Sequence, residues 1–468
     1  MYCQLDALRH CLPASVRHTL KEIPESLDET YERIVMDIKK GTRAHAYRIL
    51  QCMAVAIRPL SVNELAELLA LDFDGAKEGI PRLNTDWRWQ DHEQAVLSTC
   101  SSLITVVVAH DSRVVQFSHF SVKEFLMSGR LATSTNDISQ YHIALEDANT
   151  VLAQACVGVL LRDPADQDVA DHISLTRYAA KHWVTHAQVE NVASRIRDGM
   201  QHLFDPNKSY FYTWLQSHDV NYASFLDDFQ STIQPEAAPL YSAAFCGFDE
   251  VVTVLAFENP QHARAIGGGC GTAMHAAALQ GHVQVVRSLI QCGVDTNVRG
   301  LWDWTPLHSA SWWGAANMVQ YLLDHGADVD SQDKLQATPL YFAATRGHLD
   351  VVRVLLDHHA DVNSRCCGGQ TPLHGASSDD LAKGDHPGVV GLLLKYGANP
   401  NARDNDGKTP LHLVPSSKPE VAHILLKHGA GVDVEDNEGK TPLLAAVAED
   451  RSDIALLLSG IISRDVSV

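Results

Sequence analysis

The sequence predicts a mainly α-helical protein in two parts: a first half of separate helices with one β-hairpin, and a second half built as a solenoid of stacked helix pairs. The tripeptide Thr-Pro-Leu occurs at Thr305, Thr338, Thr371, Thr409 and Thr441. Its spacings of 33, 33, 38 and 32 residues are those of a helical repeat. Three Ser-x-x-Glu sequences in the first half are typical of helix N-termini. A solenoid offers a long binding surface rather than a catalytic pocket, so this fold class favours binding over catalysis.

The Ser-x-x-Glu sequences place helices within residues 1–134. They begin at Ser26, Ser61 and Ser121 and predict helices over about 27–40, 61–71 and 121–130. A further helix is expected over about 44–57. Two β-branched runs, Leu103 to Val108 and Val114 to Ser118, are divided by His110-Asp111-Ser112 and predict a hairpin. Three helices, a hairpin and a fourth helix form a winged-helix arrangement.

Residues 135–235 are expected to form a helical linker domain. Helices are predicted over Ile138 to Leu161, Leu175 to Ala187 and about Val189 to Leu203. Trp183 and Trp214 are expected in its core. The segment from Ser231 to Pro239 is expected to connect this domain to the repeats. We expect the repeats over residues 236–468.

The unit that begins at Thr305 shows how each repeat is predicted to fold. Thr305 suits a helix N-cap, and Pro306 suits the first turn, where its missing N–H costs nothing. Gly314 can end this first helix in the left-handed conformation. The second helix carries Met318, Val319, Leu322 and Leu323 as an apolar stripe. Six clear units and one degenerate unit, which begins at Ala238, repeat this pattern.

Three departures from the pattern predict irregularity toward the C-terminus. His359 stands where the other clear units have Gly, and a left-handed backbone there would cost about 1–2 kcal/mol. The unit from Thr371 carries five extra residues within Ser377 to Gly388, which we expect to form a bulging loop. Pro415 and Pro419 are expected to shorten the helices of the next unit.

The repeats and several segments of the first half resemble known families. With T-P-L-H-x-A as its core, the repeat resembles the ankyrin repeat. The segment Pro24 to Ile34 resembles the region that follows the nucleotide-binding core of fungal NACHT–ankyrin proteins, which are signalling NTPases of the STAND class. Arg58 to Leu65 and Phe117 to Leu126 resemble the winged helix of that family, and Tyr178 to Trp183 resembles its helical linker.

The resemblance places the family's P-loop upstream of position 20, and no such loop occurs in this sequence. Gly407-Lys408-Thr409 and Gly439-Lys440-Thr441 look like the end of a P-loop. They lack its leading glycine, since position 402 is Ala and position 434 is Val. We therefore expect no nucleotide hydrolysis and no bound nucleotide. No local catalytic signature is present, so the sequence predicts a protein that is not an enzyme and has no cofactor.

Composition narrows the range of partners. The formal net charge is −20, and both halves are acidic: 21 Lys+Arg against 30 Asp+Glu in residues 1–235, and 16 against 27 in the rest. An acidic surface repels phosphate backbones, so nucleic acid is not expected as a partner. No apolar run is long enough to span a bilayer. The ten cysteines include no C-x-x-C pair, and the first residues do not resemble a secretory signal. We expect a cytoplasmic protein, with a nuclear location left open.

The histidines are interpreted as structural rather than as metal ligands. His275, His308, His374 and His412 occupy the fourth place of the T-P-L-H turn, where the family resemblance implies that the imidazole bonds back to the turn. His325, His358 and His428 lie at the ends of second helices, where a cation suits the helix dipole. No metal site is expected.

The candidate partner-binding residues come from the positions that vary in ankyrin-like proteins: the hairpin tip before each Thr and the end of the first helix. In the units from Thr305 and Thr338 they are Leu301, Trp302, Trp304, Trp312, Trp313, Lys334, Leu335, Thr345 and Arg346. Large aromatic side chains favour binding hot spots because they bury much area at little entropic cost. Packing of these tryptophans between neighbouring units is the alternative, most of all for Trp304.

These observations predict a protein–protein interaction scaffold that binds its partner through the concave face of the ankyrin repeats, with a regulatory winged-helix region. One alternative is a fragment of a NACHT signalling NTPase receptor that lacks its nucleotide-binding core. A winged-helix DNA-binding regulator is disfavoured, because the helix from Ser61 to Leu71 carries Glu64 and Glu67 but no Lys or Arg.

Overall fold

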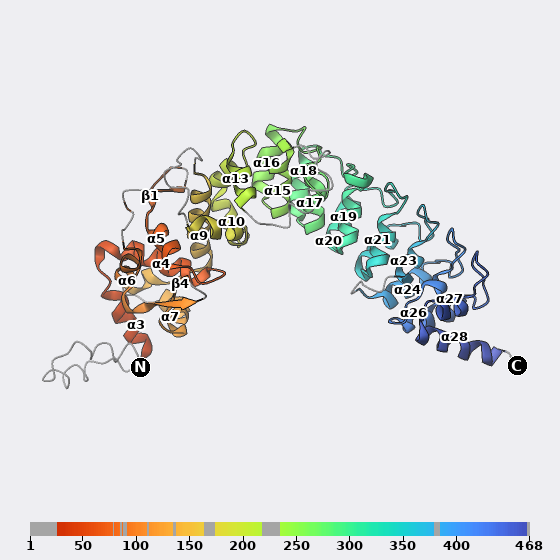
Figure 1. Ribbon diagram of the computed structural model, residues 1–468. Coiled ribbons are helices and arrows are strands. Elements are labelled where there is room, and N and C mark those ends of the chain that lie inside the picture. The colour runs from red at the N-terminus through yellow and green to blue at the C-terminus, as the bar shows by residue number, and fades with distance from the viewer. Residues whose placement is uncertain are drawn as a thin grey trace. The chain divides into compact units, whose positions relative to one another are not determined.

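The computed structural model describes residues 26–77, 79–84, 87, 91–109, 112–133, 137–162, 174–217, 235–378 and 384–465. The chain is mainly helical and divides into two compact units, Met1–Asn221 and Tyr222–Val468 (Figure 1). The finer domain boundaries expected from the sequence, at residues 134 and 235, stay a prediction.

The first unit contains the predicted winged helix. Its three helices are α4 (Arg43–Val55), α5 (Val62–Leu69) and α6 (His92–Cys100), followed by an antiparallel hairpin of β3 (Ile104–Ala109) and β4 (Ser112–Phe117). A third extended segment joins this hairpin, because the Val115 N–H donates to the Leu60 carbonyl (2.9 Å) and Ser61 bridges Val114. Helix α3 (Leu27–Met36) precedes this core, while α7 (Phe120–Leu126) and α8 (Gly129–Ala132) follow it.

Three elements that the sequence did not predict, two strands and a helix, lie between α5 and the hairpin. The helix expected to reach residue 71 ends at Leu69, and the chain continues as an antiparallel pair, β1 (Leu71–Lys77) and β2 (Ile80–Leu83). Helix α6 follows, and it rather than α3 is the third helix of the winged-helix core. Its apolar pattern is short and weak, but its start carries a local signal, since the Asp91 carboxylate accepts the Gln94 N–H (3.0 Å).

Helices complete the first unit. They are α9 (Leu145–Leu160), α10 (Ser174–Ala187), α11 (Val192–Arg195), α12 (Arg197–Leu203) and α13 (Tyr210–Ser217). Trp183 and Trp214 are buried, as predicted, and their ring centroids lie 5.5 Å apart in an edge-on contact. The Trp214 indole N–H donates to the Ala180 carbonyl (2.9 Å), so this buried polar group is satisfied.

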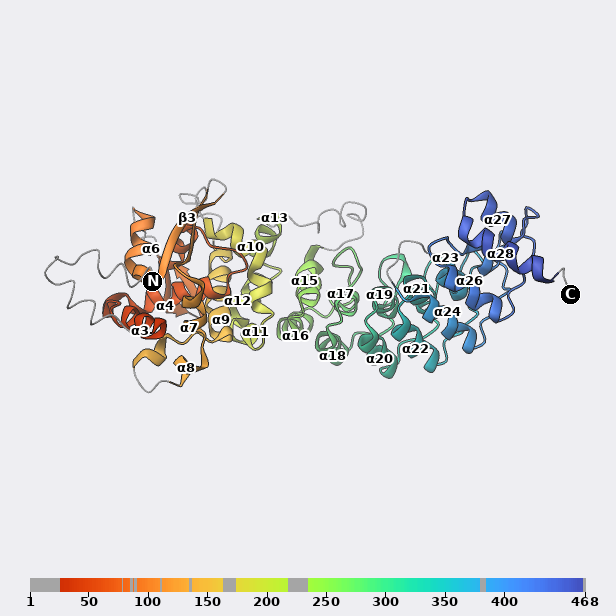
Figure 2. The same cartoon turned by 90° about the horizontal axis from the view of Figure 1, so that it is seen from below.

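The second unit is a stack of helix pairs, and seven pairs occur among its described residues. The first helices are α15 (Ala238–Cys246), α17 (Ala273–Gln280), α19 (Pro306–Trp313), α21 (Pro339–Arg346), α23 (Pro372–Ser378), α25 (Pro410–Leu413) and α27 (Pro442–Ala448). The second helices are α16 (Asp249–Glu258), α18 (Val283–Gln291), α20 (Ala316–Asp324), α22 (Leu349–Asp357), α24 (His386–Lys395), α26 (Pro419–Lys427) and α28 (Ser452–Asp465). Figure 2 shows first and second helices in two rows, so each pair packs on the next. This confirms the predicted ankyrin architecture.

A buried histidine joins each T-P-L-H turn to the repeat that follows. The Thr305 N–H donates to Nδ1 of His308 (3.1 Å), and Nε2 of His308 donates to the Ala337 carbonyl of the next unit (3.1 Å). Because a carbonyl only accepts, the proton of the neutral ring resides on Nε2. His275, His374 and His412 bond to the carbonyls of Trp304, Lys408 and Lys440 in the same way. The four imidazoles are therefore structural clamps between repeats.

The hairpin tips are also hydrogen-bonded from repeat to repeat. The Lys334 N–H donates to the Trp302 carbonyl (2.9 Å), and the Cys367 N–H donates to the Leu335 carbonyl (2.7 Å). At the ends of the second helices, Nδ1 of His325, His358 and His428 each donates to a carbonyl of its own helix. The three histidines lie at the second-helix ends, as the sequence placed them, and the favourable interaction of a cation with the helix dipole stays a prediction.

The predicted irregularities are only partly present. Helix α25 is cut to four residues by Pro415, but α26 keeps nine residues because Pro419 occupies its first turn, where proline is tolerated. The expectation for Pro419 was therefore wrong. Residues 379–383 of the expected loop within Ser377 to Gly388 lie outside the described residues. His359 has a φ of 65°, in the left-handed region, as the equivalent glycines do.

Replacing His359 with Gly should stabilise the repeat unit by about 1 kcal/mol, because glycine removes the left-handed strain of a side chain. The reverse change, Gly429→Ala, should destabilise it by a similar amount, since Gly429 has a φ of 87° and its Cβ would meet no neighbour. Urea midpoints of the two variants measure this. Equal midpoints for His359→Gly and the parent would show that the residue carries no strain.

Acid should weaken the stack through the clamping histidines. Burial lowers the pKa of His275 and His308 to about 4, and it also lowers the pKa of His374 and His412. As the pH falls, the histidines of the unfolded chain are protonated first, because their pKa of about 6.5 is higher than in the folded protein. The free energy of unfolding is therefore highest above about pH 6.5 and decreases below it, by about 2 kcal/mol for each of His275 and His308 at pH 5.

Urea unfolding at pH 7.5 and pH 5 tests this. The variant His308→Gln should be less stable at pH 7.5 but should lose less stability on acidification, because one of the titrating groups is gone. An unchanged pH dependence in this variant would contradict the role of His308.

Candidate partner-binding surface

The nine residues singled out from the sequence lie in two adjacent repeats. Leu301, Trp302 and Trp304 lead into α19, and Trp312 and Trp313 end that helix; Lys334 and Leu335 form the next hairpin tip, and Thr345 and Arg346 end α21. The backbone bond from Lys334 to Trp302 joins the two tips, and α19 packs on α21. The fold therefore brings these segments together.

Three of the aromatic rings in this region form a packed cluster. The ring centroid of Phe342 lies 4.9 Å from that of Trp304 and 5.6 Å from that of Trp312, and the two tryptophans are 6.0 Å apart. The Trp304 indole N–H donates to Asp333 (3.3 Å), and the Arg346 guanidinium lies 4.2 Å from the centre of the Trp312 ring. Trp304 and Trp312 are half-buried by these contacts, which fits the packing alternative for this pair.

Phe342 is not among the nine residues predicted from the sequence, although a signal was present. The residue after the fourth place of the turn is Ser242, Ala276, Ser309, Gly375, Leu413 or Ala445 in the six other units, and Phe342 is the aromatic residue at this place. Thr345 is also tied into the fold, because its hydroxyl donates to the Tyr341 carbonyl (2.9 Å).

Of the four other apolar residues of the set, Leu301 is half-buried and three are exposed. Trp302 and Trp313 are each 54% exposed and Leu335 is 55% exposed. Trp302 has a φ of 61° and Asp303 a φ of 59°, a left-handed pair that costs about 1–2 kcal/mol per residue. Strain of this kind often accompanies a functional site. The surface thus consists of exposed apolar residues beside a packed aromatic cluster with Arg346 on it.

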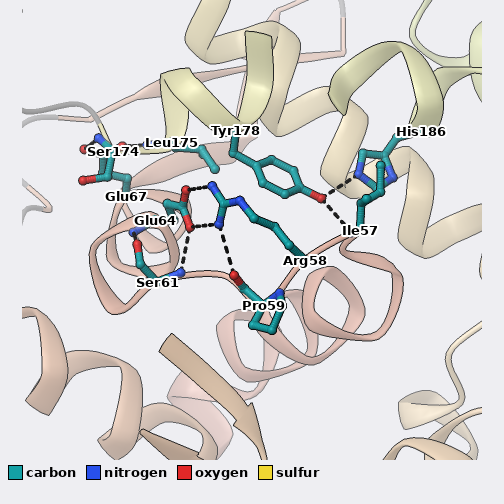
Figure 3. Close-up of polar contacts among 10 residues, drawn as sticks. All are labelled: Ile57, Arg58, Pro59, Ser61, Glu64, Glu67, Ser174, Leu175, Tyr178 and His186. Carbon is teal, nitrogen blue, oxygen red and sulfur yellow. Dashed lines mark hydrogen bonds and ion pairs between the residues drawn. The ribbon is translucent and has the colours of Figure 1, made fainter. Parts of the chain in front are cut away.

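A second candidate site is a buried polar network in the first unit, centred on two glutamates of α5 (Figure 3). The Glu64 carboxylate accepts a hydrogen bond from the Ser61 N–H (2.7 Å) as part of a capping box. It also accepts hydrogen bonds from both terminal nitrogens of the Arg58 guanidinium (3.0 and 2.5 Å). The hydrogen bond to Glu64 raises the pKa of Arg58. Glu64 is buried, and the ion pair with the Arg58 guanidinium offsets the free-energy cost of burying its charge.

Glu67, one turn further along α5, binds the start of α10. Its carboxylate accepts the backbone N–H groups of Ser174 (3.0 Å) and Leu175 (2.9 Å), which would otherwise lack helical partners. Deeper in the same region, the Tyr178 hydroxyl contacts Nε2 of His186 (2.8 Å) and accepts the Ile57 N–H (3.1 Å). Burial, with a smaller effect of His182, lowers the pKa of His186 to about 4. The network thus links the winged helix to α10 through charge-assisted bonds.

The sequence-based argument against DNA binding used the helix from Ser61 to Leu71, but this is not the helix that a winged-helix protein would place in a DNA groove. That helix directly precedes the wing and is α6, not the helix from Ser61 to Leu71. Helix α6 contains no Lys or Arg, and its Glu93 pairs with Arg113 of β4. Glu64 and Glu67 are used inside the fold. Neither α5 nor α6 therefore carries a cationic Lys or Arg side chain for phosphate contact.

The described part of the chain contains neither a metal-ligand cluster nor a membrane-length apolar helix. No group of three or more His, Cys, Asp or Glu there is arranged to hold a metal ion. Within the same residues, no helix combines the length and apolar character needed to cross a membrane.

Comparison with protein families supports both the ankyrin-repeat fold of the second unit and the winged-helix fold of the first. The ankyrin-repeat family profile matches three times, over residues 240–333, 328–404 and 379–466. A second profile, described as the winged helix domain of GPI inositol-deacylase, matches residues 31–136. The chain therefore carries a winged-helix domain of this type followed by ankyrin repeats. The description of the second profile gives no evidence for or against catalysis by this chain.

One curated protein is similar over much of the chain. It is the azaphilone pigments biosynthesis cluster protein L of Monascus ruber, with 29% identity over 295 residues. The match covers 59% of this chain and spans 61% of the length of that relative.

Replacing Glu67 with Ala should destabilise the first unit by about 2 kcal/mol, because two backbone N–H groups of α10 lose their acceptor. The matched control is Glu124→Ala, which removes an exposed carboxylate from α7 and should change stability by no more than about 0.5 kcal/mol. Hydrogen exchange of the α10 amides reports the loss directly. Equal exchange in the two variants would show that Glu67 does not hold α10.

Proposed function

We propose that this chain is a protein–protein interaction scaffold that binds a partner protein through its ankyrin repeats. The binding surface is formed by the hairpin tips and first-helix ends of the units from Thr305 and Thr338, which the ankyrin resemblance identifies as the concave face. The observation that carries the proposal is the exposure of Trp302, Trp313 and Leu335 beside a rigid aromatic cluster. Exposed aromatic residues on a rigid support are what binding hot spots require.

The roles of the nine residues follow from their contacts. Trp302, Trp313 and Leu335 supply apolar area to the partner. Trp304 and Trp312, with Phe342, hold the surface in place, and Leu301 and Thr345 shape its edges. Arg346 and Lys334 are the cationic groups, so they select partner segments that carry a carboxylate near an apolar side chain. No catalytic residue and no cofactor is assigned, and the location that we propose is cytoplasmic.

The double variant Trp302→Ala/Trp313→Ala should lose partners without losing stability, because both side chains are exposed. Trp304→Ala should instead lower stability by about 2–3 kcal/mol, because it removes a packed ring. Thermal unfolding and quantitative mass spectrometry of proteins retained by the immobilised chain measure the two effects.

The control is Phe257→Ala, which removes an 81% exposed aromatic side chain from α16, away from this surface. Proteins retained by the parent and by this control, but not by the double variant, would support the surface. Retention of the same proteins by all three would show that the two tryptophans do not bind.

The alternative is that the chain is part of a NACHT signalling receptor, an NTPase whose nucleotide-binding core is supplied elsewhere. The winged-helix match at residues 31–136 and the NACHT-like segments support it. The glutamate network would then be the regulatory part, since it ties the winged helix to the linker helix α10. Association with a separately supplied nucleotide-binding core, measured by size-exclusion chromatography, tests this function.

A further inference from the structure

One side chain bonds the base of each hairpin in the stack to the base of the next hairpin. It lies eight residues before the Thr of the turn, and in four units its nitrogen donates to the backbone carbonyl two residues past the end of a second helix. The pairs, at 2.9 to 3.2 Å, are Arg264 with Gly293, Asn297 with Gly326, Asn363 with Gly397 and Asn401 with Gly429. We call this hydrogen bond the hairpin link.

The hairpin before Thr338 has an aspartate, Asp330, in this place. One of its carboxylate oxygens accepts the Asp361 N–H (2.9 Å), just as the Asn side-chain oxygens accept the equivalent N–H groups (2.7 to 3.0 Å). The other oxygen therefore occupies the place of the amide nitrogen, which in the Asn units points to the carbonyl. Here that carbonyl belongs to His359. An ionised carboxylate only accepts hydrogen bonds, so it cannot make the hairpin link.

The unit from Thr338 also lacks the clamping histidine. Tyr341 stands in its place, and the Tyr341 hydroxyl donates to the side-chain oxygen of Gln370 in the next hairpin (2.9 Å). Burial raises the pKa of Tyr341 to about 12, so this bond keeps its proton at acid and neutral pH. The junction between the units from Thr338 and Thr371 therefore differs from the histidine-clamped junctions in two links at once.

The surroundings of Asp330 favour its neutral form. Burial raises the pKa of Asp330, and the charges of Asp361 and Asp328 add to this effect, while the hydrogen bond from the Asp361 N–H opposes it. His358, at the end of α22, lies 3.7 Å from Asp324. Asp330 therefore binds a proton more readily than an aspartate in the unfolded chain.

We propose that Asp330 is a proton-operated latch between the units from Thr338 and Thr371. When its carboxyl group is protonated, the O–H donates to the His359 carbonyl and completes the hairpin link. Ionisation removes this donor and leaves two oxygens that repel each other. Acid should therefore tighten this junction, whereas it weakens the junctions clamped by histidines. The latch does not depend on the proposed function, although Lys334 and Leu335 lie in the hairpin that contains Asp330.

Asp330→Asn should fix the latch in its closed form, because an amide donates at every pH. It should raise the urea midpoint by about 0.3 M at pH 7.5. The folded chain holds the Asp330 proton more tightly than the unfolded chain does, so the stability lost to ionisation returns as the pH falls through the folded pKa. The gain should therefore be smaller at pH 4.5, measured in sucrose to keep the chain folded. No gain at pH 7.5, or an equal gain at both pH values, would overturn the latch.

Two matched variants separate the latch from a general effect of charge. Asn363→Asp makes the opposite change in the next hairpin, so it should lower the urea midpoint at pH 7.5 and lower it less at pH 4.5. Asp433→Asn repeats the change of Asp330→Asn at the equivalent place before Thr441, where the side chain is exposed, and it should leave both midpoints unchanged. A gain from Asp433→Asn as large as that from Asp330→Asn would show that net charge, and not the hairpin link, is responsible.

Carbon-detected NMR measures the latch directly. The carboxyl carbon of Asp330 should titrate with a pKa above that of an ordinary aspartate. The carbonyl carbon of His359 should shift with the same midpoint, because it gains a hydrogen bond as Asp330 is protonated. A His359 carbonyl that does not respond, or an Asp330 pKa at or below the ordinary value, would contradict the proposal.

Discussion

The stack depends on buried imidazoles, which four of its seven described helix pairs carry at the fourth place of the T-P-L-H turn. Each of the four rings accepts a hydrogen bond from the turn of its own repeat and donates one to a carbonyl of the next, so it fixes two units at once. The apolar stripes of the helices supply most of the burial, but they are compatible with small sliding motions. The directional bond sets the register of the stack, and with it the position of the hairpin tips that carry the aromatic surface.

The aromatic surface shows how that register serves binding. The cluster of Trp304, Trp312 and Phe342 takes rings from two repeats, so it is complete only when those repeats are stacked as the clamp of His308 requires. The exposed side chains of Trp302 and Trp313 are attached to the same segments. A partner that binds them therefore meets a surface already ordered by folding, which lowers the entropic cost of association. In the first unit, the α5 glutamates give the winged helix a comparable fixed link to α10.

Much of this architecture could be predicted because its signals are local. Residues close together in the sequence determine the T-P-L-H turns, the apolar stripes of the helices, and the hairpin of β3 and β4. Helix α6 and the β1–β2 pair were missed because their apolar patterns are weak and their packing partners are distant in sequence. The contact of Glu67 with Ser174 joins residues more than a hundred positions apart, so no local pattern could indicate it. Phe342 was missed because only an alignment of the repeats with one another reveals it as unusual.

The most direct test of the account is the protonation state of the clamping histidines. Long-range proton–nitrogen NMR correlations of the imidazoles identify which ring nitrogen carries the proton. The account predicts that His275, His308, His374 and His412 are neutral at pH 7.5 and carry the proton on Nε2, and that His275 and His308 stay neutral when the pH is lowered to about 5. Rings protonated on Nδ1, or rings that titrate near pH 6.5, would contradict it, because neither could hold one repeat to the next in this way.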